Sequence, residues 1–218
     1  MMFKIYKIIV FTILAFFFLA SCSETPEKEE VCLLESCKND GVIVDCKCEC
    51  PEGYLGETCQ RIDPTATQKL LDNGVSPFTL LSAGIQIDVV YGKKFQNGII
   101  FHLNIIDKVV KITTEKDLEE KLQWTNAVNY CENLEVEGTS DWYLPNLTEV
   151  EEIRNILYVQ LKVGSFEDDY YWTSVTVDNS PNDAIGVFFL NGNNGPIEKD
   201  RMNDVSYNYV RAVRKIQM

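Results

Sequence analysis

The sequence is poor in histidine: His102 is the only one among 218 residues. It stands in an apolar segment, and no second histidine can complete a Ser/His/Asp or Cys/His catalytic arrangement. Acidic residues are abundant, but no spacing singles out a carboxylate pair for glycoside hydrolysis. We therefore predict no catalytic residues and no cofactor, and we expect a binding or structural protein rather than an enzyme.

Basic residues are also scarce. Lys and Arg number 20 against 33 Asp and Glu, which gives a formal net charge of −13. Because no basic patch is visible, nucleic acid and anionic lipid surfaces are excluded as expected partners. The same acidity disfavours binding of sulfated polysaccharide.

The N-terminus lacks an apolar run long enough to span a bilayer, which takes about 20 residues. Its apolar run, residues 8–19, follows Lys4 and Lys7 and suits a secretory signal. The run ends in Leu-Ala-Ser-Cys at Cys22, which resembles the lipobox of bacterial lipoproteins. The resemblance implies a signal peptide over residues 1–21, cleavage before Cys22, and anchoring by acyl chains on that cysteine. A plain secretory signal with a chance cysteine is the alternative.

Residues 22–31 form a polar, acidic stretch, which we interpret as a flexible tether. Loss of residues 1–21 removes two lysines and no acids and brings the net charge to −15. An acidic run after a lipidated cysteine resembles the surface-export signal of some Gram-negative lipoproteins. We therefore expect an outer-membrane lipoprotein of the cell envelope that faces outward.

Cysteine is almost absent after residue 60, where Cys131 stands alone, whereas six cysteines crowd into residues 32–59. In an exported chain such crowding predicts disulfides rather than a zinc site. The end of this stretch has the pattern C-x-C-x-x-G-Y-x-G-x-x-C, which resembles EGF-like modules. We accordingly assign an EGF-like module to residues 32–60 and a free, buried thiol to Cys131.

The EGF-like resemblance implies a pairing of first with third, second with fourth and fifth with sixth cysteine, although six cysteines alone allow 15 connectivities. The implied bridges are Cys32–Cys46, Cys37–Cys48 and Cys50–Cys59. The third cysteine comes later than is usual in such modules. The acidic calcium signature is missing before the first cysteine, and we expect no calcium there.

Residues 61–90 read as a linker with a short helical lead-in. Two Leu-Leu pairs, ten residues apart, are followed by Gly74 and Gly84, which predicts two single helical turns that end at glycine. The main domain is predicted over residues 91–218. Thr114 with Asp117 is interpreted as the cap of a further helical segment. Strands are expected within residues 91–103, 109–113, 171–177, 184–190 and 207–214.

Two helices form the centre of the main domain. Residues 124–134 carry an apolar stripe at spacings of three and four, and a second helix begins at Asn146 with Glu149 as a capping-box partner. Its predicted buried stripe runs from Val150 to Leu161. Helices and strands are segregated along the chain, so the fold class is α+β.

Five short motifs follow one another along the main domain. They are Asn-Gly-Ile-Ile-Phe at 97–101, the apolar helix pattern at 124–134, Asp-Trp-Tyr-Leu-Pro at 141–145, Tyr-Trp-Thr-Ser at 171–174 and Tyr-Val-Arg-Ala-Val-Arg at 209–214. Together they resemble the Lcl C-terminal domain family over roughly residues 70–216. The resemblance implies a C-type-lectin-like fold with two helices around a small, mostly antiparallel sheet. It also implies extracellular binding or adhesion, in some members to glycans.

Other residues suggest binding sites, and a structural role is the alternative for each. Trp124, Trp142 and Trp172 suit sugar stacking, but their motif positions favour the core. Asp141 with Arg211 or Arg214 suits an ion pair that holds the fold together. The Pro-Asn of a lectin calcium loop is present at 145–146 without its acid, so no metal is expected.

The remaining candidate for a ligand site is a group of loops near the C-terminus. These loops are rich in Asn and Asp and lack helical or strand patterns, as ligand-binding loops often do. The candidate ligand residues are Asn191, Asn193, Asn194, Asp200, Asn203 and Asp204. The expected function is therefore a lipid-anchored, adhesin-like protein that binds a glycan or an envelope protein. A structural envelope component is the first alternative, and an enzyme of cysteine oxidation on a lectin-like fold is the second.

Overall fold

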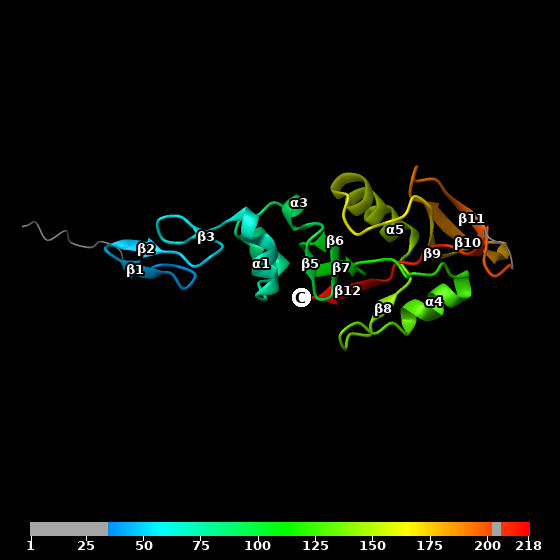
Figure 1. Ribbon diagram of the computed structural model, residues 1–218, viewed down its shortest axis with the longest axis horizontal. Helices are drawn as coiled ribbons and strands as arrows, with labels where there is room; N and C mark the ends of the chain where they lie inside the picture. Colours follow the sequence, from blue (N-terminus) through cyan, green and yellow to red (C-terminus); the bar gives the residue numbers. More distant parts are fainter. Residues whose placement is uncertain (1–34, 202–205) are drawn as a thin grey trace, which may run out of the picture. The chain divides into compact units, whose positions relative to one another are not determined.

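The computed structural model describes residues 35–201 and 206–218 (Figure 1). The proposed lipidation site Cys22, the first cysteine of the EGF-like stretch, Cys32, and the candidate residues Asn203 and Asp204 lie outside these ranges. In the part of the chain that is described, no helix is long and apolar enough to cross a membrane.

The cysteine-rich region contains two small antiparallel hairpins. β1 (Val42–Val44) pairs with β2 (Lys47–Glu49), and β3 (Tyr54–Leu55) pairs with β4 (Arg61–Ile62). Disulfides join Cys37 to Cys48 and Cys50 to Cys59. These are two of the three implied pairs, and the third involves Cys32.

Three short helices follow a 3-10 turn, η1 (Pro64–Ala66). They are α1 (Thr67–Asp72), α2 (Pro77–Ser82) and α3 (Ile87–Val90). Gly74 and Gly84, at φ 85° and 93°, follow the ends of α1 and α2. The N–H of the residue after each glycine bonds back to a leucine carbonyl of the last turn, which is the Schellman arrangement. The two glycine-terminated turns predicted from the sequence are confirmed.

A five-stranded sheet has the order β5-β6-β7-β12-β8. Its strands are β5 (Lys94–Phe95), β6 (Gly98–Asn104), β7 (Val109–Thr113), β8 (Trp142–Tyr143) and β12 (Val213–Gln217). All neighbouring strands are antiparallel. The last strand begins at Val213 and not near residue 207, because residues 208 and 209 form only isolated bridges with Leu122 and Tyr171.

A second, three-stranded antiparallel sheet has the order β11-β10-β9. It consists of β9 (Tyr170–Val177), β10 (Ser180–Phe188) and β11 (Asn194–Glu198). β11 was not expected, because its residues read as the continuation of an Asn/Gly turn. Proline at position 196 leaves this strand without one backbone donor, which an edge strand tolerates.

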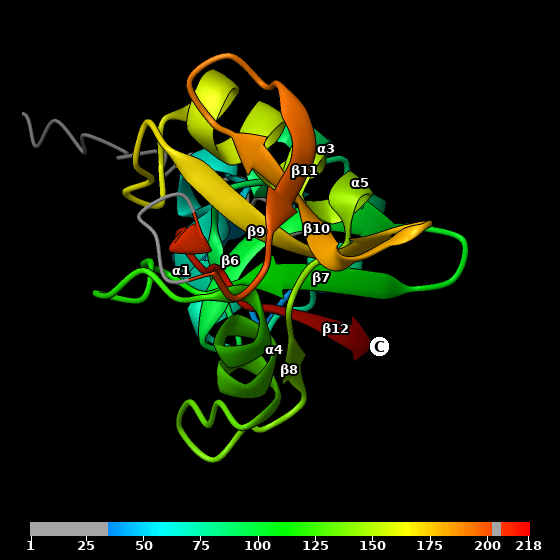
Figure 2. The same cartoon turned by 90° about the vertical axis from the view of Figure 1, so that its right-hand side faces the viewer.

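The helices α4 (Trp124–Glu132) and α5 (Leu147–Ile153) lie on opposite sides of β9 (Figure 2). The strand alternates between two apolar clusters. Trp172 packs with residues of α4, and Tyr171 packs with residues of α5. The fold is thus mixed, with small antiparallel sheets and short helices.

The second helix starts as the sequence predicts and ends differently. Asn146 and Glu149 form the complete capping box. From Arg154 the α-helix continues as a π-helix, η2 (Arg154–Leu161), and Leu161 is only half-buried. Arg154 Nε donates to the carbonyl oxygen of Phe189 at 2.7 Å. This contact joins the first residue of η2 to the residue that follows β10. The spacing of apolar residues in the sequence could not predict it.

The segment after Thr114 is not helical, although Thr114 and Asp117 were interpreted as a helix cap. The carboxylate of Asp117 bonds instead to Arg211 and Tyr171.

Candidate functional site

A groove of about 500 Å³ lies between β9, β11 and the segment that precedes β12. Such a volume is in the range of sites for small ligands. Its apolar side chains are Tyr170, Pro196, Ile197 and Tyr207. Its polar side chains are Lys121, Asp169, Glu198 and Asn208. An aromatic floor with hydrogen-bonding groups around it suits an uncharged, hydroxyl-rich ligand.

The register of the three-stranded sheet builds the apolar side of this groove. Tyr170 is opposite Phe188, and their ring centroids are 4.8 Å apart. A Cβ on Gly186 would lie 2.5 Å from Ile197 Cδ1 and 3.5 Å from Tyr170 Cδ1. Glycine at this position therefore makes room for both side chains. Tyr170 keeps 36% of its surface exposed.

The charged side chains of the groove are paired with one another. Lys121 Nζ contacts Asp169 Oδ2 at 2.5 Å and lies 4.8 Å from the ring centroid of Tyr209. Glu198 contacts Arg201 Nη1 at 3.2 Å. Because each charge has an opposite neighbour, the groove does not present a strong field of one sign.

Backbone hydrogen bonds hold the polar side of the groove in place. The N–H of Leu122 donates to the carbonyl of Asn208 at 3.0 Å, and the N–H of Tyr209 donates to the carbonyl of Tyr170 at 2.9 Å. The chain at 208–209 is therefore bonded on one side to the segment that carries Lys121 and on the other to β9.

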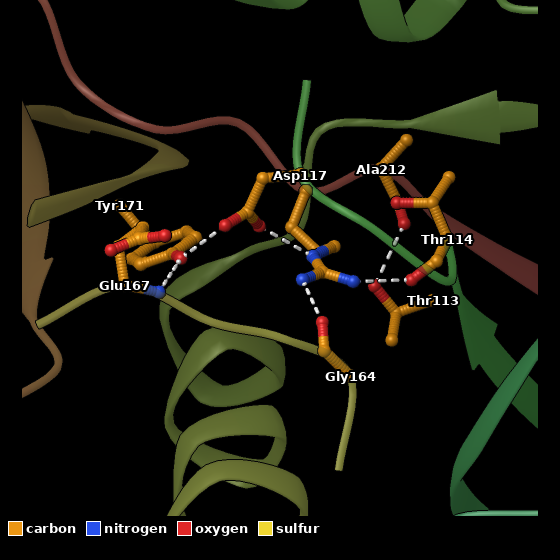
Figure 3. Close-up of polar contacts among 8 residues, drawn as sticks. Thr113, Thr114, Asp117, Gly164, Glu167, Tyr171 and Ala212 are labelled. Atoms are coloured by element: carbon orange, nitrogen blue, oxygen red, sulfur yellow. Dashed lines mark hydrogen bonds and ion pairs between the residues drawn. The ribbon is translucent and has the colours of Figure 1, made fainter. Parts of the chain in front are cut away.

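Arg211, two residues after this segment, belongs to a buried polar network (Figure 3). Arg211 Nε donates to Asp117 Oδ1 at 2.7 Å, and its other nitrogens donate to the carbonyls of Thr114 and Gly164. Figure 3 shows Tyr171 and Asp117 pointing toward one another, and the hydroxyl donates to Asp117 Oδ2 at 2.6 Å. Burial and the nearby carboxylate raise the pKa of Tyr171, which keeps its hydroxyl a donor.

Asn191, Asn193 and Asn194 of the predicted ligand site lie at the turn between β10 and β11. Asn191 Oδ1 accepts from the N–H of Asn193 at 2.9 Å, and Asn194 Nδ2 donates to Glu151 at 3.1 Å. Asn194 is moreover the first residue of β11. None of these three asparagines lines the groove around Tyr170.

Asp200 bonds to the first turn of α4. Its carboxylate accepts from the N–H and the hydroxyl of Thr125 at 3.2 and 2.7 Å. This supplies a cap and a favourable charge at a helix start where the side chain of the N-cap residue, Gln123, bonds no backbone N–H. Asp200 also lines a smaller groove of about 260 Å³ that shares Glu198 with the first.

In the part of the chain that the structure describes, Asn194 and Asp200 of the two predicted loops lie toward opposite ends of β11. β11 separates Asn194 from Asp200, and an extended stretch of this length spans about 20 Å. The sequence argument treated them as one loop group because it did not recognise this strand. It missed Tyr170 and Lys121 for a related reason, since only the fold brings residues of β9 and β11 beside the segment before α4.

The three tryptophans have structural contacts. Trp142 and Trp172 are 3% and 1% exposed, and Trp124 is partly buried against the same apolar cluster. Each indole N–H donates to a backbone carbonyl. The two arginines that the sequence offered as partners of Asp141 have different partners in the structure. Arg214 pairs with Asp141, whereas Arg211 pairs with Asp117.

His102 and Cys131 lie apart from the groove. His102 Nδ1 is 3.1 Å from Glu152 Oε2, and the thiol of Cys131 is fully buried and unpaired. Burial raises the pKa of Cys131 to about 12, so this side chain remains a thiol at neutral pH. Within residues 35–201 and 206–218, no group of three or more His, Cys, Asp or Glu could hold a metal ion.

Comparison with known families places the groove in a defined domain. The model of the Lcl C-terminal domain matches residues 104–214, just over half of the chain, and the match includes every residue that lines the groove around Tyr170. It starts after the Asn-Gly-Ile-Ile-Phe motif and is therefore shorter than the resemblance suggested. No curated protein matches the chain. By the extent of the family match, the chain belongs to the Lcl C-terminal domain family.

Proposed function

We propose that this protein is a lipid-anchored binding protein of the bacterial cell envelope that holds a saccharide in the groove around Tyr170. It acts as an adhesin-like module and not as an enzyme. The observation that carries the proposal is the partly exposed ring of Tyr170 with hydrogen-bonding side chains on several sides.

The chemistry of a sugar ring fits such a surface. One face of the ring presents C–H groups that pack on an aromatic side chain, while its hydroxyls donate and accept hydrogen bonds at the edge. Tyr170 supplies the aromatic face. Asp169 and Glu198 supply acceptors, and Lys121 supplies a donor.

The charge balance favours a neutral saccharide over a sulfated one. Lys121 and Asp169 already neutralise each other, and Glu198 has Arg201 beside it. The mature chain has a net charge of −15, so a polyanion would meet repulsion without a cationic surface in this groove to offset it.

The location and the remaining modules are part of the same proposal. The lipobox that ends at Cys22 supports an anchor in the outer membrane, and the acidic tether supports an outward-facing position. The bridges Cys37–Cys48 and Cys50–Cys59 support an EGF-like module. Helices on opposite sides of β9 support a C-type-lectin-like domain.

Two other functions were considered. A structural component that docks to an envelope protein is favoured by exposed apolar side chains along η2. Oxidation of peptidyl cysteine relies on cysteine pairs, and the main domain contains only the buried Cys131. Cysteine oxidation therefore has less support than docking to an envelope protein.

Thermal unfolding with and without sugars tests the proposal. A saccharide that fits the groove raises the melting temperature of the mature chain by mass action. Tyr170→Ala abolishes this shift, whereas Tyr170→Phe keeps it because the ring remains. A panel of sugars that shifts neither the mature chain nor the variants argues for the docking function instead.

A further inference from the structure

A second groove, of about 540 Å³, runs along η2 and the segment that follows it. Its walls include three aliphatic side chains, Val159, Val163 and Leu190, with Phe166 beside them. The aliphatic side chains are 48%, 37% and 57% exposed. Single exposed apolar residues are ordinary, but their gathering in one groove marks an interaction surface.

The charged side chains of this groove are all cationic. Arg154 and Lys162 line it, and no carboxylate does, in a chain with 33 acidic residues. Arg154 is largely occupied, since it donates to the carbonyls of Phe189 and Leu190. Among the residues that the structure describes, Lys162 has no side-chain hydrogen bond or ion pair, so its ammonium is available to a ligand.

The groove is held in shape by the fold behind it. Lys162 ends η2 at φ 54°, and the N–H of Val163 donates to the carbonyl of Leu157 at 2.9 Å. The carbonyl of Gly164 accepts from the buried Arg211. A preformed groove loses less conformational entropy on binding than a flexible one. Moreover, π-helical turns occur frequently at functional sites.

We propose that this groove binds an apolar peptide segment of a partner protein, with an acidic side chain that pairs with Lys162. Aliphatic side chains of the peptide pack on Val159, Val163 and Leu190. A sugar suits this surface less well, because three of its walls are aliphatic and the hydroxyl of Tyr158 is already bonded to Asp168. The site does not depend on the saccharide groove, which has different lining residues.

Defined peptides test the proposal directly. The probes are acetylated, amidated hexapeptides of alternating leucine and glutamate, leucine and lysine, or serine and glutamate. Each is titrated into the ¹⁵N-labelled mature chain and followed by amide chemical shifts. We expect the leucine–glutamate peptide to shift Val159, Lys162, Val163 and Leu190, and the other two to bind at least several-fold more weakly.

A charge reversal at Lys162 distinguishes charge-specific recognition of the peptide from non-specific hydrophobic binding. Lys162→Glu should weaken the leucine–glutamate peptide about fivefold or more, because an attractive pair becomes a repulsive one. The same variant should gain affinity for the leucine–lysine peptide. Lys215→Glu, an exposed lysine on β12 outside this groove, is the matched control and should change neither preference.

The spectrum of each free variant shows whether its fold is intact. An absence of shifts with the leucine–glutamate peptide, shifts elsewhere, or a preference that Lys162→Glu does not alter would each overturn the proposal. Because Tyr170→Ala leaves this groove intact, failure here is distinct from failure of saccharide binding.

Discussion

The guanidinium of Arg211 lies 2.7 Å from the carboxylate of Asp117, which stands 94 residues earlier in the chain. The arginine side chain is only 2% exposed. This pair joins the segment before α4 to the segment before β12, and Tyr171 links it to β9. The groove around Tyr170 is lined by residues from these same three segments and from β11, so the pair positions part of the site without lining it.

Breaking the pair should destabilise the fold strongly. Asp117→Ala leaves Arg211 buried without its carboxylate, and such a loss costs about 3–5 kcal/mol. Urea unfolding of the mature chain measures this change. Glu198→Ala removes the exposed pair with Arg201 and should cost about 1 kcal/mol or less. Equal costs for the two variants would mean that the buried pair contributes little.

Alkaline pH should destabilise the protein partly through Cys131. Its folded-state pKa is raised by burial to about 12, whereas the ordinary value is 9.0. The unfolded chain therefore loses this proton first, and the stabilisation that is complete below pH 9 is lost as the pH rises towards 12. Between pH 8 and pH 10 the unfolding free energy should fall by about 1.4 kcal/mol through Cys131.

The variant Cys131→Ala isolates this effect from that of other groups. Its unfolding free energy, measured in urea, should fall less between pH 8 and pH 10 than that of the unaltered chain. Parallel pH curves for the two proteins would contradict a buried, protonated thiol.

The number of reactive thiols tests the EGF-like pairing. Reagents for free thiols should label the denatured, unreduced mature protein once, at Cys131, and should label the native protein much more slowly. Peptide mass analysis identifies the labelled residue. Two or more labels would show that the implied pairing, including Cys32–Cys46, is incomplete.

Processing of the precursor tests the anchor. Globomycin, or the substitution Cys22→Ser, should leave the precursor uncleaved and unlipidated, which gel mobility and incorporation of labelled palmitate detect. Normal processing of the Cys22→Ser precursor would rule out the lipobox interpretation.

Local signals in the sequence predicted their elements well. The capping box of Asn146 and Glu149 and the glycine ends of α1 and α2 involve residues only a few positions apart. Their hydrogen bonds depend on neighbouring residues, so the sequence contains the whole pattern.

Features that depend on tertiary contacts could not be found in this way. Asp117 looked like a helix cap, yet its partner Arg211 lies far along the chain. The Asn/Gly-rich stretch concealed β11, which separates Asn194 from Asp200, and ligand binding by the predicted residues stays a prediction. The π-helical continuation of α5 has a contact between Arg154 and Phe189 at its start, across 35 residues.

The most direct test of the central claim is binding of the mature, unlipidated chain to a broad panel of neutral and sulfated glycans, with and without a chelator. We predict saturable binding to a neutral saccharide that persists in the chelator. Tyr170→Ala should weaken it about tenfold or more, which corresponds to about 1.4 kcal/mol. Tyr170→Phe, and Tyr158→Ala in the second groove, should retain it. Binding that survives Tyr170→Ala, or no binding to any glycan, would contradict a saccharide site in this groove.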